Sequence, residues 1–201
     1  CREILDRAAA GKLPAADWVE IVGTAHSLGI RSSSTMMYGH VDEPRHWLGH
    51  LRLLAGMQRR NLAEGHAGFT EFVTLPFIHT NAPVYLAGIA RPGPTAAENR
   101  AVTAMSRLLL HPLIPNIQAS WVKLGPAWAQ RCLQAGANDL GGTLMNESIS
   151  RAAGASHGQE FAPAEMQRLI GALGRPWRQR NTLYGDVDAE PLHQPRGDLD
   201  I

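Results

Sequence analysis

The sequence lacks an excess of charge, a long apolar run and a charged-then-apolar leader. Nineteen lysines and arginines nearly balance 18 aspartates and glutamates, for a formal net charge of +1. No overall field would recruit nucleic acid or an anionic membrane, so we expect a small-molecule ligand. No apolar run approaches the length of about 18 residues that a membrane-spanning helix requires. With no leader visible either, we expect a cytoplasmic protein without a membrane partner.

Cysteine is scarce, with Cys1 and Cys132 as the two examples. They lie far apart and make no closely spaced set of metal ligands. A disulfide would need an oxidising compartment, of which the sequence gives no sign. Cys132 falls in a helical pattern, where a small buried apolar role is expected.

What the sequence does contain is a repeat of short apolar strands and amphipathic helices. Strands are expected over 30–37, 68–75, 116–122 and 137–141, and helices over 4–10, 15–28, 43–63, 95–110, 126–136 and 163–173. Such alternation predicts an α/β fold of parallel βαβ units. A complete (β/α)8 barrel needs about twice as many strands. We therefore expect the C-terminal half of a TIM-type barrel over 1–185 and a disordered tail over 186–201.

Polar residues follow the expected strands, where barrels gather side chains around a shared cavity. His40, His79 and Asp139 each stand at a strand end, and Lys123 follows the third strand. The hydroxyls of residues 32–35 fall on both faces of the first strand. Each also has a structural reading: hydrogen bonds within a loop, a helix cap, a solvated lysine, or packing against neighbouring backbone.

A metal site is the reading that nine histidines invite. His46 and His50 lie four apart on one expected helix, a spacing that allows chelation, but a solvated flank is favoured for both. A zinc hydrolase using His40, His79 and Asp139 is an alternative. It would need further ligands such as an HxH pair, which the sequence does not contain.

Three separated motifs stand out in the sequence: RSSSTMMYGHVD at 31–42, TEFV at 70–73 followed by LPFIHTNAP at 75–83, and ANDLGGTL at 137–144. Together and in this order they resemble the tyrosine-using half of the FO synthase family over 13–185. The resemblance implies a radical S-adenosylmethionine (SAM) barrel. In that family a 4Fe-4S cluster and SAM generate a radical that activates L-tyrosine. The hydroxybenzyl group then joins 5-amino-6-(D-ribitylamino)uracil, and a partner radical SAM domain closes the deazaflavin ring.

The family's cluster is held by a CxxxCxxC loop, and this sequence has none. The resemblance therefore implies a chain that is inactive alone, with the cluster-bearing N-terminal barrel half upstream or lost. It places Tyr38, Gly39, His40 and Asp42 near SAM. Residues expected to face tyrosine or the uracil are Ser34, His79, Asn81, Lys123 and Asp139. No individual catalytic role is assigned.

Two other functions stay open from the sequence. A sister radical SAM enzyme of futalosine-dependent menaquinone assembly would share the barrel and the Gly39-His40 turn, although the loop at 78–83 favours FO synthase. A non-catalytic half barrel that binds a nucleoside is the second. In every case an isolated half barrel has unpaired strand edges, and we expect poor solubility or self-association.

Overall fold

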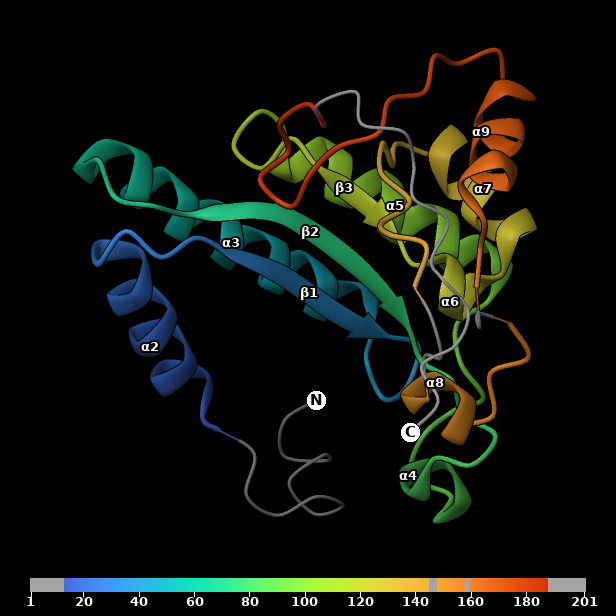
Figure 1. The fold of residues 1–201 in the computed structure, drawn as a ribbon. Coiled ribbons are helices and arrows are strands. Elements are labelled where there is room, and N and C mark those ends of the chain that lie inside the picture. Colours follow the sequence, from blue (N-terminus) through green and yellow to red (C-terminus); the bar gives the residue numbers. More distant parts are fainter. Residues whose placement is uncertain (1–12, 145–147, 158–159, 188–201) are drawn as a thin grey trace, which may run out of the picture.

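Three parallel strands and a layer of helices make up the fold of this chain (Figure 1). The computed structural model describes residues 13–144, 148–157 and 160–187. The elements are α2 (Ala15–Ser27), β1 (Ser32–Tyr38), α3 (Pro44–Glu64), β2 (Phe69–Pro76), α4 (Pro83–Leu86), α5 (Ala96–Leu110), β3 (Ile117–Ala119), α6 (Trp121–Leu124), α7 (Pro126–Gln134), α8 (Ile149–Ala152) and α9 (Pro163–Gly171). The strand order is β1-β2-β3, with both pairs parallel.

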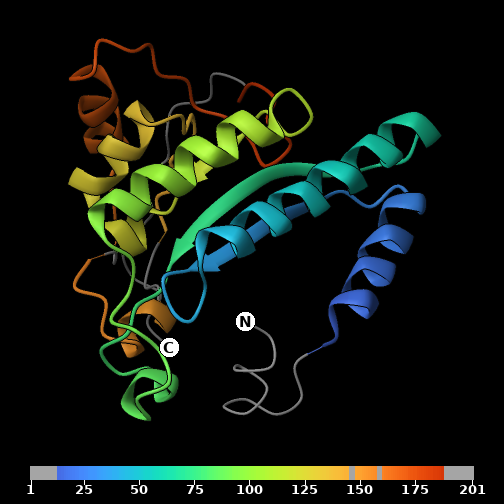
Figure 2. The same ribbon diagram turned by 180° about the vertical axis from the view of Figure 1, so that it is seen from behind.

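The two faces of the sheet differ because successive side chains of a strand point to opposite sides. Met36 and Tyr38 of β1 and Phe72 of β2 are buried against the helices. Figure 2 shows α3 and α5 lying across this face. The alternate residues form the opposite side, called here the open face: Ser33, Thr35, Met37, Glu71, Val73, Leu75 and Gln118. In a parallel (β/α) barrel this would be the face that lines the cavity.

The main core lies between the sheet and helices α3 and α5. Trp47, Leu51 and Leu54 recur at helical spacing along α3 and are buried. The helix α5 begins at a capping box, in which the Thr95 hydroxyl accepts from the Glu98 N–H at 3.2 Å and the Glu98 carboxylate accepts from the Thr95 N–H at 2.7 Å. These helices therefore form where the apolar pattern and the cap predict them.

A second core joins α6, α7 and α9 beyond β3. Cys132 is fully buried there, as expected for a small apolar residue, together with Trp121, Leu133 and Phe161. Leu169 of α9 packs against this cluster. The helix expected over 163–173 is present as α9.

The fourth expected strand is reduced to a single parallel bridge between Gln118 and Asp139. The N–H of Ala119 donates to the Asp139 carbonyl at 2.9 Å, and the N–H of Asn138 donates to the Ile117 carbonyl at 3.0 Å. Gly141 then takes a φ of +76°, which ends any strand. The sheet thus has three strands, and the segment at 137–141 lies at its edge without extending it.

The third strand is shorter than expected. It ends at Ala119, and Trp121 and Val122 belong to α6. The Trp121 indole donates to the Gly142 carbonyl at 3.0 Å, which holds this turn against the segment after Asp139. The helix expected over 4–10 and residues 188–201 of the expected tail lie outside the described residues. None of the described helices is long and apolar enough to cross a membrane.

Candidate functional site

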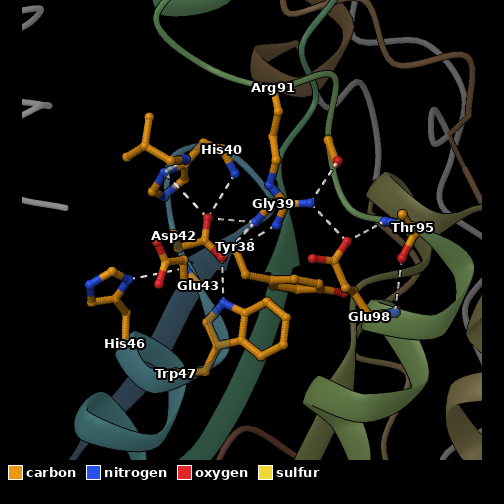
Figure 3. A network of polar contacts seen from close by, with 12 residues as sticks. Tyr38, Gly39, His40, Asp42, Glu43, His46, Trp47, Arg91, Thr95 and Glu98 are labelled. Carbon is orange, nitrogen blue, oxygen red and sulfur yellow. Dashed lines mark hydrogen bonds and ion pairs between the residues drawn. The ribbon is translucent and has the colours of Figure 1, made fainter.

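The turn after β1 is organised by one carboxylate (Figure 3). Asp42 accepts from the N–H of Gly39 at 2.8 Å and the N–H of His40 at 2.7 Å. It also accepts from the indole N–H of Trp47, on the first turns of α3. Asp42 is 7% exposed. Its carboxylate therefore ties the end of β1 to the start of α3.

The hydrogen bonds to Asp42 outweigh the effect of its burial. Burial alone would raise the pKa of this carboxyl, but the donors from Gly39, Trp47 and His40 hold it below its usual range. Arg91 Nη2 lies 3.8 Å from Asp42 Oδ2, while Arg91 Nη1 donates to Glu98 at 2.8 Å. Asp42 is thus ionised, with its two oxygens already engaged.

His40 is 8% exposed and belongs to the same turn. The N–H of Val41 donates to Nδ1 at 2.6 Å, so the neutral ring carries its proton on Nε2. Burial lowers the pKa of His40, although the Asp42 carboxylate beside it acts in the opposite direction. The ring meets Phe77 edge-on, with centroids 5.9 Å apart.

Tyr38 and Gly39 define the shape of the turn. The Tyr38 side chain points to the helices, where it is fully buried and its hydroxyl donates to Asn99 Oδ1 at 2.7 Å. Gly39 takes a φ of +93°, and a Cβ there would lie 2.4 Å from Pro94 Cδ. The four residues expected near SAM are therefore brought together, but Tyr38 has its side chain on the helix side of the sheet.

A second group lies around α8, beyond the carboxyl ends of β2 and β3. Asn81 donates from Nδ2 to the Ala152 carbonyl at 3.0 Å, and Lys123 Nζ donates to Ser150 Oγ at 3.0 Å. Asn81 and Lys123, two of the residues expected to face the substrates, therefore contact the same short helix. His79 packs its ring against Tyr85, with centroids 4.7 Å apart.

A cavity of about 180 Å³ lies beside this group. It is bounded by the loop after β2, the loop before α5, and helices α5 to α7. Its lining includes Phe77, Ile78, Pro94, Asn99, Lys123 and Trp128. Lys123 is the predicted site residue that this cavity and the α8 contacts share.

Asp139 lies on the open face, in a third group. Arg180 binds its two oxygens, with Nη2 to Oδ1 at 3.0 Å and Nε to Oδ2. Arg180 Nη2 also lies 3.7 Å from Glu71 Oε2, which accepts from the Tyr184 hydroxyl. The sequence did not single out Glu71, Arg180 or Tyr184. The signal for Glu71 was a charged residue within an apolar strand, whereas the other two follow the last helix with no motif of their own.

Ser34 points away from the open face. It is 2% exposed, and its hydroxyl donates to the Glu71 carbonyl at 2.8 Å. The hydroxyls of β1 on the open face are Ser33 and Thr35. For Ser34 the geometry favours the packing alternative.

The predicted site residues therefore do not surround one point. Tyr38 faces the helices, whereas Asp139 is on the opposite side of the sheet, and His79 packs in the loop after β2. The SAM-assigned residues form the Gly39–Asp42 turn. Asn81 and Lys123 meet at α8. These are three separate groups rather than a single shared cavity.

Neither a zinc site nor the iron–sulfur cluster finds ligands in the described part of the chain. There, no group of three or more His, Cys, Asp or Glu side chains is placed to hold a metal ion. Cys132, the cysteine among the described residues, is buried in the second core. The zinc-hydrolase alternative thus has no ligand set here, and the described residues do not fit a 4Fe-4S cluster.

Comparison with known proteins gives a family match and close relatives. The family model described as "CofH/MqnC C-terminal region" matches residues 66–192. The chain is 69% identical over 180 residues to FO synthase of Streptomyces coelicolor, covering 90% of this chain and 20% of the relative. It is 58% identical over 174 residues to FO synthase of Mycobacterium tuberculosis, covering 87% and 20%.

A shorter relative matches over a larger share of its length. The 5-amino-6-(D-ribitylamino)uracil–L-tyrosine 4-hydroxyphenyl transferase of Methanopyrus kandleri is 51% identical over 185 residues, which is 92% of this chain and 49% of the relative. The chain therefore spans between a fifth and a half of the relatives it matches.

Proposed function

Since the chain belongs to the family of CofH/MqnC C-terminal regions, we propose that it is the substrate- and SAM-binding half of a radical SAM transferase. The proposed reaction joins the hydroxybenzyl group of L-tyrosine to 5-amino-6-(D-ribitylamino)uracil. The observation that carries this proposal is the 51% identity, over 92% of the chain, to a relative named for that transfer.

The proposed partner is a complementary N-terminal barrel half. The strand β1 is paired to β2 alone within the described sheet, so its other edge could take a further strand once His50, whose Nε2 lies 3.1 Å from the Thr35 carbonyl there, gave way. The relatives are two to five times longer than the matched region, which leaves room for such a half. We place the cluster ligands there, and a partner radical SAM domain would close the deazaflavin ring.

A cluster held by the complementary half would, together with SAM, supply the radical chemistry. The chain's own contribution at the Gly39–Asp42 turn is shape. Asp42 uses its oxygens to fix the turn, and the His40 carbonyl accepts from the Arg91 N–H at 3.0 Å, so the turn would act on SAM through the form that these bonds give it. Tyr38 supports the turn from the helix side.

For the substrates, the group at α8 and the open face offer different chemistry. Lys123 brings a cation to the carboxyl ends of the strands, suited to the carboxylate of tyrosine. His79 and Asn81 lie in the loop at the same end and could bond the uracil. Asp139 would act from the open face, where Arg180 binds both of its oxygens. Ser34 would affect the substrate site only indirectly, through its hydrogen bond to the Glu71 carbonyl in the backbone of β2.

The test is an assay of the chain combined with its complementary half. The two halves are coexpressed, the cluster is reconstituted, and product is followed with tyrosine plus the ribitylaminouracil or with a futalosine-type substrate. We expect product from the first pair only, and none from the chain alone. Turnover of the futalosine-type substrate instead would assign the sister activity.

The variant that tests the role of Lys123 is Lys123→Ala. Its matched control is Arg151→Ala, which removes an exposed cation from the neighbouring α8. Lys123→Ala should raise the KM for tyrosine about tenfold, because a charge-assisted hydrogen bond is lost. Equal effects of the two variants would remove Lys123 from the substrate site.

A further inference from the structure

Four side chains from three distant parts of the chain meet on the open face. Glu71 comes from β2, Asp139 from the bridge beside β3, and Arg180 and Tyr184 from the segment after α9. Figure 1 shows that segment, in red, returning to the sheet beside β3 and β2. The residues 178–187 are called here the return segment.

The contacts of the return segment are specific in geometry. The guanidinium of Arg180 binds both oxygens of Asp139, and its Cζ lies 3.9 Å from the centre of the Tyr184 ring. The Tyr184 hydroxyl donates to Glu71. One arginine thus meets two carboxylates and one aromatic face at once, which fixes its plane.

These groups are also shielded from water. The side chains of Asp139, Glu71 and Arg180 are 9%, 18% and 23% exposed, because the return segment covers this part of the open face. Tyr184 takes a left-handed φ of +65°, which is unfavourable for a residue with a Cβ. Backbone of this kind persists where the surrounding contacts hold it, and those contacts are with Glu71 and Arg180.

The height of the cluster on the sheet gives it a place in the cavity. Asp139 pairs with Gln118, which pairs with Val73 in the middle of β2, and Glu71 lies two residues nearer the start of that strand. The Gly39–Asp42 turn and the loop carrying His79 lie at the other end, beyond the carboxyl ends of the strands. The cluster therefore lies on the open face away from the carboxyl ends of the strands, a position called here the floor of the open face.

We propose that Arg180 is a positioning residue, which with Tyr184 fixes Asp139 and Glu71 as the floor of the substrate cavity. The inference rests on the proposed function, because it takes the open face to be the cavity wall. Arg180 and Tyr184 are then the two residues of the return segment that belong to the site. Asp139 and Glu71 are then held in the arrangement that their bonds to Arg180, Tyr184 and the Gly141 N–H allow.

The experiment compares Arg180→Ala, Arg180→Lys and Tyr184→Phe with Arg178→Ala in the assembled, reconstituted enzyme. Arg178 is a matched control because it lies in the same segment and pairs with the exposed Asp186. We expect Arg180→Ala to raise the KM for a substrate about tenfold or more, since misplacement by about 1 Å is costly. Arg180→Lys should restore part of that loss, and Arg178→Ala should match the wild type.

A second readout needs no turnover. Hydrogen–deuterium exchange is measured on the assembled enzyme at the Ala119 N–H, which donates to the Asp139 carbonyl. Faster exchange in Arg180→Ala than in Arg178→Ala is expected if Arg180 holds this edge. Equal exchange in the two variants would overturn the inference.

The outcomes separate the two proposals. A wild-type assembly that forms no product would overturn the proposed function and this inference with it. An active wild type whose KM is unchanged in Arg180→Ala, with exchange at Ala119 accelerated, would overturn the inference alone. A fall in kcat at constant KM, equal in Arg180→Ala and Arg180→Lys, would show a role in stability only and would also overturn it.

Discussion

Asp42 stands in a sequence position that suggested a ligand, but its oxygens serve the protein itself. They accept from two backbone N–H groups and the Trp47 indole. A buried donor that loses its acceptor costs about 1–3 kcal/mol. The residue is therefore first a support for the turn, and its effect on SAM would be indirect.

Replacing Asp42 by alanine should lower the free energy of unfolding by about 3–5 kcal/mol, because three donors and Arg91 lose their partner. Urea unfolding followed by circular dichroism measures this. The control is Glu20→Ala, an exposed carboxylate on α2, for which a change within about 0.5 kcal/mol is expected. Similar losses in the two variants would contradict the role given to Asp42.

His26 makes stability depend on pH. The ring is fully buried, with Nε2 2.9 Å from Ser32 Oγ and Nδ1 2.8 Å from Asn61 Nδ2. Burial, with a smaller contribution from His66, lowers its pKa, so the unfolded chain takes up the proton first as pH falls. The contribution of His26 is full above the unfolded pKa of about 6.5 and is lost below it.

We therefore expect the free energy of unfolding to fall between pH 7 and pH 5, by up to about 1.4 kcal/mol per pH unit for each such group. In His26→Gln the decline should be shallower than in the wild type. His40 and His50 also have pKa values lowered by burial, so part of the decline remains in His26→Gln.

At the scale of single residues, the sequence predicted positions better than directions. The turn at Gly39 is where the motif places it, and Asp139 lies beside β3 as expected, although in a single bridge and not at the end of a fourth strand. Ser34 and Tyr38 point to the helices, and this could not be predicted because polar side chains occur on both faces of β1. The alternation of a strand fixes the faces only relative to each other.

At the scale of elements, the turn between β1 and α3 depends on a glycine. Gly39 has a left-handed φ and lies against Pro94. Gly39→Ala should destabilise the chain by more than about 1 kcal/mol and disturb the Asp42 contacts. Gly49→Ala is the matched control, since it lies in α3 with open space around its Cβ position and should stabilise by about 0.5–1 kcal/mol. Thermal unfolding compares them, and a stabilising Gly39→Ala would contradict this view of the turn.

The elements were mostly predictable, and the exceptions have a physical cause. The helices α3, α5 and α7 have strong apolar periodicity, and α5 also has its cap. The run around Trp121 is short and apolar, a pattern that strands and buried helices share. The hydrogen bond from the Trp121 indole to the Gly142 carbonyl favours the helix α6 over a continued strand. That contact joins distant positions, so no local pattern reports it.

At the scale of the whole molecule, apolar surface remains on and beside the sheet. Met37 on the open face is 49% exposed, and Ile30, Ile21 and Leu28 near the edge of β1 are between 56% and 72% exposed. Proteins usually pair or protect the edge strands of a sheet and cover an apolar sheet face with other elements. The isolated chain is therefore expected to self-associate until a complementary half covers it.

Sedimentation velocity tests this directly. The chain alone should show concentration-dependent association, which the complementary half should suppress. Met37→Lys, which puts a charge on the open face, should reduce self-association, while Leu53→Lys on the outer side of α3 should not. A chain that stays monomeric at all concentrations would contradict the expectation.

The bond between Tyr184 and Glu71 spans 113 positions of the chain. At translation rates of about 5–20 residues per second, β2 leaves the ribosome on the order of ten seconds before its partner is made. Throughout that interval the carboxylate of Glu71 and the apolar residues around it have no cover from the return segment. Folding around Glu71 is therefore completed only after Tyr184 has been made, however much of β2 has formed by then.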